Sequence, residues 1–499
     1  MPAAVQWSAC LLLRAALALW PHSGEGRTPM FGDFEAQRHW LEVTVGLKVG
    51  DWYRQTTAND LQYWGLDYPP LTAYVSWVFG KVAGSVPALS PLVALHSSRG
   101  HESVEGKVYM RATVLLMDAL VLLPAVFFIA RRTRTNALVA ASVPALLLID
   151  HGHFQYNGVC IGLTLLAAES LLCGNEILAS VLFCLSLNFK QMALYYAPVF
   201  FFALLRKAVV EELTIVGKLV HLIRLGVTVI FTFAILWAPF CLWPGEGETC
   251  LSSLGHVLGR QFPFERGIFE DKVANIWYTL SVLVDFRGFL STPVLVRLSL
   301  LLTLLLLAPV GWCLLAFPIS TDSLLLALVN SSLAFFLASF QVHEKSLLLA
   351  LVPAVFFCQR GVGGSGPLPL QAWFQVFGCF TMFPLLRRDN LALAYVACNV
   401  LFIGLLFGVP SFESTASLPA VGLLGKWEDG LIGAFVTVST AGALALHACE
   451  ALLPPPARYP HLYPALISMY GAVNLLVFFT YTSLLHRKVV SSSAKLKQR

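Results

Sequence analysis

The chain has 499 residues, of which 57% are hydrophobic and only 12% are charged. A soluble protein carries roughly twice that share of charged residues, so the composition excludes an ordinary soluble domain and predicts that lipid surrounds most of the chain. The formal net charge of +5 is spread thinly, with no basic and aromatic stripe, which excludes nucleic acid as the partner.

The first two apolar runs define the expected orientation. Residues 4–20 are interrupted by Arg14, and they lack both the basic start and the small-residue cleavage site of a signal peptide, so a retained first span is favoured over a cleaved one. The run at 109–130 is followed at once by the basic segment RRTR, which marks the cytosolic side. The long loop between these runs, residues 22–107, is therefore expected in a lumen.

Further apolar runs suit helices of about 20 residues and bring the predicted spans to roughly fourteen. The sequence thus predicts an all-α polytopic membrane protein, a helical bundle in which residues 1–499 form one membrane-embedded domain. An even number of spans returns the tail, residues 486–499, to the cytosol, where its basic residues agree with the positive-inside rule. After the second span, the predicted spans lie near 137–150, 158–173, 176–188, 191–206, 219–243, 292–316, 323–340, 346–358, 368–386, 390–408, 430–452 and 463–485.

The tail ends in KLKQR, which places Lys495 and Lys497 as in the KxKxx signal that coat machinery reads on endoplasmic-reticulum proteins. A basic tail that is merely solvated is the alternative. If the signal is real, the protein resides in the endoplasmic-reticulum membrane.

The same alternation puts the polar segments on the lumenal face, in the first loop, in a second large loop at 244–291, and in shorter connections. Ionisable groups are costly beside hydrocarbon, so their concentration on one face indicates function. Carboxylates, a guanidinium and aromatic rings are suited to sugars, which predicts an enzyme acting on a glycan or glycolipid. The segments are GDFEAQRHW at 32–40, DYPP at 67–70, HGHFQYN at 151–157, NFKQM at 188–192, FPFERGIFEDKVANIW at 262–277 and QVHEK at 341–345.

Asp33 is the candidate general base, with Glu35 or Arg38 orienting it. The structural alternative is that Asp33 caps a helix and that Glu35 supplies a favourable first-turn charge. The two carboxylates could also invite a divalent cation, but without further oxygen ligands they are weak evidence for one. His39 completes this group of candidate substrate contacts.

Asp67 and Tyr68 precede two prolines, a pattern typical of a helix start, and are expected to help shape the acceptor site. His153, Gln155 and Asn157 are expected to donate hydrogen bonds to sugar or phosphate, since two imidazoles without a third ligand seldom bind a metal. Five cations on the same face suit a lipid phosphate and would stabilise a phosphate leaving group: Lys190, Arg266, Lys272, His343 and Lys345.

The eleven cysteines show no CxxC or Cys/His pattern, so most are expected to be small core residues. Cys241 and Cys250 flank a polar loop and could pair in an oxidising lumen, although their spacing alone does not fix the geometry.

Several multi-residue segments in register over residues 30–350 resemble the dolichyl-phosphate-glucose-dependent glucosyltransferases of the endoplasmic reticulum. They are GDFEAQRHW, LQYWGLDYPPLTAY, SRG, IDHGHFQYN, FKQMALYYAP, RGIFEDKVANIW and FQVHEK. The first and the EDKVANIW run favour the branch of the family that adds the first α-1,3-glucose to the nine-mannose lipid-linked oligosaccharide. The sister branch that adds the second glucose is the alternative.

The resemblance implies a GT-C helical bundle with a lumenal site, a dolichyl-phosphate glucose donor, a dolichyl-pyrophosphate-linked acceptor, and no metal or other cofactor. It also implies inversion at the anomeric carbon, with Asp33 as the base and His343 as a donor-phosphate contact, joined less firmly by Lys190, Arg266 and Lys272. A transporter is the alternative from another class, but transporters place ionisable residues near the bilayer midplane, often in repeated halves, and this chain shows no such repeat.

Overall fold

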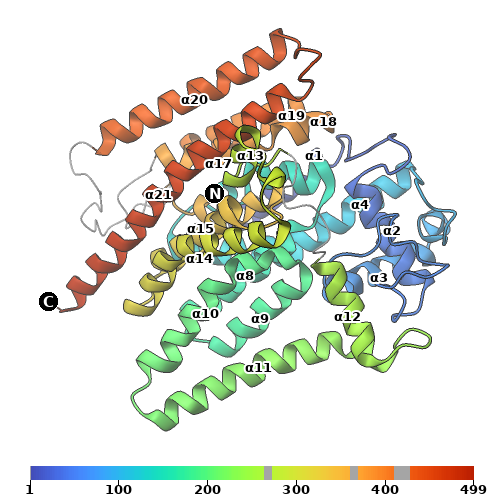
Figure 1. The fold of residues 1–499 in the computed structure, drawn as a ribbon, viewed down its shortest axis with the longest axis horizontal. Helices are drawn as coiled ribbons and strands as arrows, with labels where there is room; N and C mark the ends of the chain where they lie inside the picture. The colour runs from blue at the N-terminus through green and yellow to red at the C-terminus, as the bar shows by residue number, and fades with distance from the viewer. Residues whose placement is uncertain (1, 263–271, 360–368, 410–427, 499) are drawn as a thin grey trace.

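The computed structural model describes residues 2–262, 272–359, 369–409 and 428–498, and within these ranges every regular element is helical (Figure 1). Seven stretches are long and apolar enough to cross a membrane, as judged by length and composition. They confirm the all-α polytopic class. The seven are α4 to α5 (Val104–Thr133), η4 to η5 (Gln191–Glu211), α11 (Ile215–Leu242), α14 (Thr292–Ala316), α15 (Thr321–Ala338), Gly430–Leu452 of α20 and Leu462–Ser492 of α21.

Two of these stretches are composite, because α4 (Val104–Met117) continues through η2 (Asp118–Leu122) into α5 (Leu123–Thr133), and α10 (Ala197–Arg206) lies between η4 (Gln191–Tyr196) and η5 (Lys207–Glu211). Shorter apolar helices join them, and the predicted total of about fourteen spans stays a prediction. The shorter helices are α1 (Ala3–Leu17), α8 (Asn157–Leu172), α9 (Glu176–Phe189) and α19 (Ala392–Gly408).

Prolines divide two of the runs that the sequence predicted as single spans. The run at 137–150 is three pieces, α6 (Ala137–Ala141), α7 (Pro144–Leu147) and η3 (Leu148–Phe154), because Pro144 lacks an N–H and so starts a new helix. The run at 368–386 is likewise divided into α17 (Pro369–Thr381) and α18 (Phe383–Arg388), with a proline at the start of α18. The run at 346–358 is formed by η7 (Glu344–Leu347) and α16 (Leu348–Val355).

Helix α15 lies in the core of the bundle, where it packs against α14, α16 and α21 (Leu462–Gln498). Its most apolar window is 83% buried, against 11% for the corresponding windows of α11 and α20 (Glu428–Leu452). Figure 1 shows α20 and α11 along opposite edges of the molecule. These two helices therefore present most of their apolar surface to the surrounding lipid.

Helix α1 packs into the bundle through a buried ion pair. The Arg14 Nε atom lies 2.6 Å from Asp118 Oδ2, and neither side chain is more than 2% exposed. His151 Nε2 lies 2.9 Å from the same oxygen. A charge inside a membrane bundle is tolerated when it is paired, which explains why an arginine interrupts the first apolar run.

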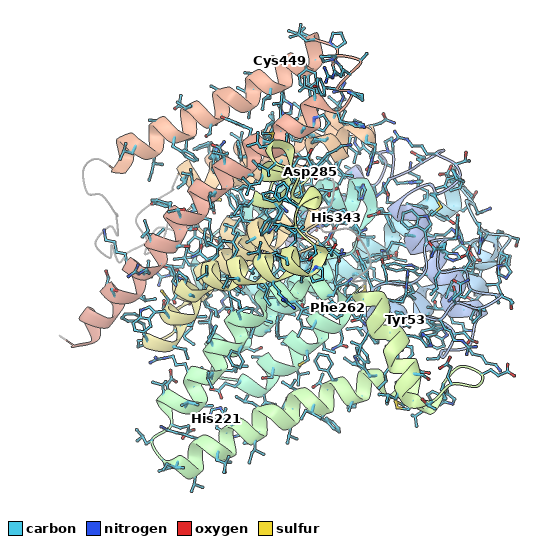
Figure 2. The ribbon with its side chains drawn as sticks, viewed as in Figure 1. Tyr53, His221, Phe262, Asp285, His343 and Cys449 are labelled. Carbon is cyan, nitrogen blue, oxygen red and sulfur yellow. A yellow bond between two sulfur atoms is a disulfide. The ribbon has the colours of Figure 1, made fainter. Side chains whose placement is uncertain are left out.

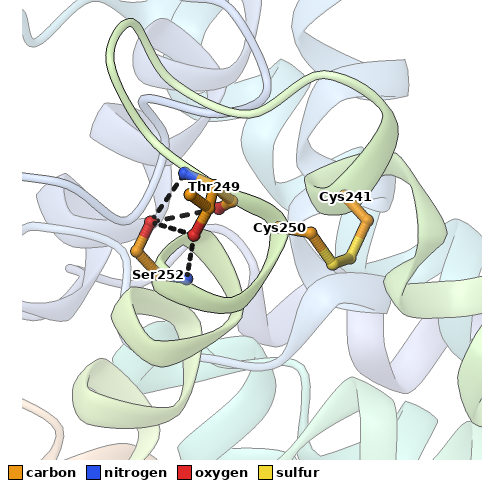
Figure 3. The surroundings of a disulfide bond; sticks show 4 residues. All are labelled: Cys241, Thr249, Cys250 and Ser252. Atoms are coloured by element: carbon orange, nitrogen blue, oxygen red, sulfur yellow. Dashed lines mark hydrogen bonds between the residues drawn. A yellow bond between two sulfur atoms is a disulfide. The ribbon is translucent and has the colours of Figure 1, made fainter.

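The first loop folds into α2 (Asp33–Gly46), α3 (Pro70–Ser85) and η1 (Ser90–Val93), which lie at the right of Figure 1, far from the C-terminus at lower left. The second large loop contains α12 (Cys250–Gln261), α13 (Ile276–Leu283) and η6 (Phe286–Gly288). A disulfide joins Cys241 near the end of α11 to Cys250, so the pairing left open by the sequence is present (Figure 3). Beside it, a Thr249–Ser252 capping box starts α12.

Candidate active site

Asp33 is the first residue of α2, and Gly32 occupies the capping position. The interpretation of Asp33 as the helix cap is therefore wrong. Gly32 has a φ of 141°, and a Cβ added there would lie 2.9 Å from the backbone of Ser23, so this tight entry requires glycine. As a first-turn carboxylate, Asp33 lies at the positive end of the helix dipole.

Three donors from two segments of the chain, 151–157 and 341–345, converge on one oxygen of Asp33. Lys345 Nζ lies 2.5 Å from Asp33 Oδ2, and His153 Nε2 lies 3.1 Å from it. Gln155 Nε2 also donates to Oδ2. Among the residues that the structure describes, no donor reaches Oδ1, and the Asp33 side chain is 24% exposed. One carboxylate oxygen is thus held firmly while the other remains able to accept a proton.

The cluster fixes the charge of Asp33. Burial would raise the pKa of its carboxyl, but the charges and hydrogen bonds of Lys345 and His153 outweigh burial and hold this pKa well below its ordinary value. In turn, burial would lower the pKa of the Lys345 ammonium, but Asp33 and Glu344 outweigh it and the net pKa is raised. Both groups are therefore ionised near neutral pH.

His153 also reaches a residue that the sequence analysis missed. Its Nδ1 atom is hydrogen-bonded to Asp389 Oδ2, and both side chains are only 2% exposed. Asp389 opens the short turn between α18, which ends at Arg388, and α19. Alternation of the predicted spans puts this turn on the same face as the other polar segments, and that signal could have found it.

Lys190 lies at the centre of a second group of predicted residues. Its Nζ donates to Asn157 Oδ1 at 2.6 Å and to Gln155 Oε1 at 3.1 Å, and it lies 4.6 Å from the centre of the Tyr68 ring. Burial, together with the charge of Lys345, lowers the pKa of Lys190 to about 8. Gln155 connects this group to the first one, because its amide nitrogen donates to Asp33 while its oxygen accepts from Lys190.

Glu35, Arg38 and His39 lie in a separate buried network rather than against Asp33. Arg38 is fully enclosed, and its guanidinium binds Glu35 at 2.6 Å and Glu42 at 2.9 Å. It also donates to the Leu92 carbonyl at 2.7 Å. His39 Nδ1 lies 3.0 Å from Glu42 Oε2. This network fastens α2 to η1, so it supports the position of Asp33 without touching it.

The remaining predicted residues lie around these groups. His343, labelled near the middle of Figure 2, is 45% exposed and lies 2.8 Å from Glu344 Oε2 through its Nδ1. The backbone carbonyl of Asp67 accepts from Gln191 at 3.1 Å, and that of Lys272 accepts from Ser468 at 2.7 Å. Arg266 lies outside the described residues. Over the described ranges, no group of three or more His, Cys, Asp or Glu side chains has a geometry that could hold a metal ion.

Comparison with known proteins places this geometry in context. The family model described as the ALG6, ALG8 glycosyltransferase family matches residues 10–482. A relative from Arabidopsis thaliana is 40% identical over 95% of this chain and 87% of its own length. One from Gallus gallus is 39% identical over 94% of each chain, and one from Dictyostelium discoideum is 36% identical over 94% and 92%. The Gallus gallus relative is named dolichyl pyrophosphate Man9GlcNAc2 alpha-1,3-glucosyltransferase, and the other two carry the same name preceded by "probable".

Proposed function

Because the chain belongs to the ALG6, ALG8 glycosyltransferase family, we propose that it transfers glucose from dolichyl-phosphate glucose to a dolichyl-pyrophosphate-linked Man9GlcNAc2 oligosaccharide. The product is the first α-1,3-glucosyl linkage of this precursor. The names of the relatives support the first-glucose step over the second, since they specify the unglucosylated acceptor.

The proposed chemistry is a single displacement with inversion. The 3-hydroxyl oxygen of the acceptor mannose attacks C1 of the donor glucose while the bond from C1 to the phosphate oxygen breaks. The electron pair of that bond leaves with dolichyl phosphate, and Asp33 takes the proton of the hydroxyl. Because dolichyl phosphate is already a stable anion, the reaction needs a base and cations but no strong general acid.

The observation that carries this proposal is the asymmetric hydrogen bonding of Asp33. Three donors hold Oδ2, while Oδ1 is left for the acceptor hydroxyl. A general base must be held within hydrogen-bonding reach of the proton that it removes, and a partly exposed carboxylate on a rigid helix end meets that need. The low pKa keeps Asp33 ionised near neutral pH, at the cost of intrinsic basicity.

Cations around Asp33 form the proposed donor-phosphate site. Lys345 and Lys190 are almost fully enclosed, so a phosphate entering here would meet two ammonium groups in a region of low dielectric. His343 is exposed at the edge of the same region and is proposed as a further phosphate contact. Arg266 and Lys272 are also proposed to contact the donor phosphate, and the family resemblance is the support for this role.

The acceptor is proposed to contact the polar side chains that lie beside Asp33 and Lys190. The Tyr68 hydroxyl donates a 3.2 Å hydrogen bond to Gln155. The side-chain oxygen of Asn157 accepts one from Lys190. Their hydroxyl and amide groups match the hydroxyl-rich surface of an oligosaccharide. Asp67 is proposed to complete this surface. His153, the other predicted contact, binds Asp33 and Asp389 through its two ring nitrogens and so acts through Asp33, while Glu35, Arg38 and His39 act through the shape of the loop.

The proposed location is the endoplasmic-reticulum membrane, with the active site lumenal and the C-terminus cytosolic. The Cys241–Cys250 disulfide supports a lumenal position for the second loop, since disulfides persist in oxidising compartments. The basic segment at the end of α5, residues 131–134, supports a cytosolic position for that end of the span Val104–Thr133. Recognition of Lys495 and Lys497 by retrieval coats remains part of this proposal.

The test uses purified full-length protein in lipid nanodiscs with dolichyl-phosphate glucose. Nine-mannose and monoglucosylated lipid-linked acceptors are supplied separately, and a mass gain of one hexose is scored. We expect transfer to the first acceptor alone, and Asp33→Asn should lower the rate by about 10²–10⁴-fold, the usual contribution of a general base. Asp60→Asn is the matched control, because Asp60 lies on the same loop and, within the part of the chain that the structure describes, its side chain accepts a hydrogen bond only from the backbone nitrogen of Gln62.

Transfer only to the monoglucosylated acceptor would assign the sister step and keep the mechanism. Wild-type rates in Asp33→Asn would overturn the base assignment. Absence of transfer to either acceptor, from folded protein, would reject the enzymatic proposal and favour transport.

A further inference from the structure

Asp389 connects a distant part of the chain to the proposed base. It follows the last residue of α18, and its backbone nitrogen donates to the carbonyls of Leu385 and Leu386 at 3.3 and 3.2 Å. Asn390 adopts a positive φ of 60°, which closes the turn before α19 begins. The turn is therefore fixed by its own hydrogen bonds, and it directs the Asp389 carboxylate inward.

His153 is held on both ring nitrogens and on its backbone. Its Nδ1 atom meets Asp389 and its Nε2 atom meets Asp33, while its carbonyl accepts from the Ser23 nitrogen at 2.9 Å. Gly152 allows this approach, because a Cβ there would lie 2.9 Å from a methyl carbon of Leu391 at the start of α19. The imidazole is thus a fixed bridge between two carboxylates on different helices.

We propose that Asp389 is a positioning residue for glucosyl transfer, which keeps His153 with an Nε2–H directed at Asp33 Oδ2 and thereby turns Oδ1 towards the acceptor. The inference rests on the proposed role of Asp33 as the base. In each turnover, Asp33 Oδ1 takes the hydroxyl proton, and the Nε2–H proton stays on His153. Asp389 touches neither substrate nor reacting atom.

The charges around His153 agree with this arrangement. The ring is faced by two carboxylates, Asp33 and Asp389, and by one ammonium, Lys345, whose Nζ lies 3.4 Å from Nε2. Burial and Lys345 lower the pKa of His153, but the two carboxylates outweigh them and the net pKa is raised. An imidazolium donates from both nitrogens, so each carboxylate receives a hydrogen bond, and the four groups are neutral together.

The test compares Asp389→Asn with Glu450→Gln in the full-length protein in lipid nanodiscs. Asparagine keeps the shape of aspartate but removes its charge, so the His153 pKa should fall and the imidazolium should be lost at lower pH. We expect kcat to drop by about 10- to 100-fold near neutral pH, with both KM values little changed. The alkaline limb of the pH profile of kcat, where the rate falls as the pH rises, should move to lower pH. Acidification should therefore partly restore the rate of this variant.

Glu450 is the matched control because it is a buried carboxylate that binds Arg387, two residues before Asp389 in α18, and has no hydrogen bond to His153 among the described contacts. Its Oε1 lies 2.5 Å from Arg387 Nη1, and its side chain is 6% exposed. Glu450→Gln should leave the alkaline limb unchanged. An unmoved limb in Asp389→Asn, or an equal shift in Glu450→Gln, would overturn the positioning role.

Two further variants keep the outcomes separable. If Asp389→Asn fails to fold, Asp389→Glu takes its place, because glutamate keeps the charge but carries it one methylene further out. This variant should lower kcat and keep the wild-type alkaline side of the pH profile. A shifted alkaline side would reject the proposal. Asp33→Asn tests the underlying function. If Asp33→Asn is inactive while Asp389→Asn behaves as wild type, only the positioning role of Asp389 is rejected. If Asp33→Asn is active, the assignment of Asp33 as the base is rejected.

Discussion

Replacing Lys345 with glutamine tests the ion pair that holds the proposed base. The Nζ and Oδ2 atoms lie 2.5 Å apart, with side chains 8% and 24% exposed. At an effective dielectric of 20, two charges at this distance attract by about 7 kcal/mol, before the cost of desolvating both groups is subtracted. Removing one partner of a buried pair typically costs about 3–5 kcal/mol. We expect the lower end of that range, because Asp33 keeps His153 and Gln155 as donors.

The matched control is Lys107→Gln. Lys107 Nζ lies 2.9 Å from Glu25 Oε1, but the side chains are 26% and 36% exposed, and exposed pairs of this kind contribute about 0–1 kcal/mol. Unfolding by SDS in mixed micelles measures both variants. The buried substitution should lower the unfolding midpoint clearly and the exposed one hardly at all.

The pH dependence of the same variants checks the cause. Because Lys345 lowers the pKa of Asp33, its removal should move that pKa upward, towards its ordinary value. An ionised Asp33 with a depressed pKa stabilises the fold above its unfolded pKa and loses that contribution as the pH falls. In Lys345→Gln, kcat should therefore begin to fall at a higher pH than in the wild type, which moves the acid limb of its pH profile upward. The loss of stability on acidification should become smaller, because the folded pKa of Asp33 then lies closer to its unfolded pKa. Equal losses in the two lysine variants, with an unmoved acid limb, would refute the reasoning.

Three other substitutions have defined outcomes. His343→Ala should raise the KM for dolichyl-phosphate glucose more than that for the acceptor; steady-state kinetics would contradict the donor role if only the acceptor KM changed. Arg38→Met leaves the buried carboxylates Glu35 and Glu42 without their cation, so SDS unfolding should show a loss of about 3–5 kcal/mol, and wild-type stability would argue against the network. Cys250→Ser removes the disulfide to Cys241, which closes a loop with a sequence separation of 9, and should lower the free energy of unfolding by about 2–3 kcal/mol in the same assay. No loss would indicate that other contacts hold the loop.

Much of the fold class followed from composition and hydropathy, because a chain that is solvated by lipid must bury its backbone polar groups in helices. The family predicted from the motifs is confirmed by the match over residues 10–482. Element boundaries were less predictable. Pro144 divides one predicted span into short pieces, and hydropathy alone gives no weight to a missing N–H.

The candidate site was predictable in membership but not in pairing. Asp33, His153 and Lys345 were all selected from separate polar segments, and the structure brings them together. The sequence could not show that Arg38 turns away into its own buried network, since this depends on the packing of α2 against η1. Asp389 was missed because a short charged turn between apolar runs resembles an ordinary solvated connection.

The buried pair of Arg14 and Asp118 has a consequence for biosynthesis. The two residues are 104 positions apart, so the arginine emerges from the ribosome well before its partner. An unpaired arginine at the centre of a helix opposes membrane insertion by about 2.5–3.5 kcal/mol, and Arg14, in the last turn of α1, carries a smaller penalty of the same sign. We therefore expect α1 to wait at the translocon until Val104–Thr133 arrives, so that both helices enter the bilayer as a neutral unit. A nascent chain that ends before Asp118 should leave α1 extractable by alkali, and stable integration of that fragment would show that the first helix inserts alone.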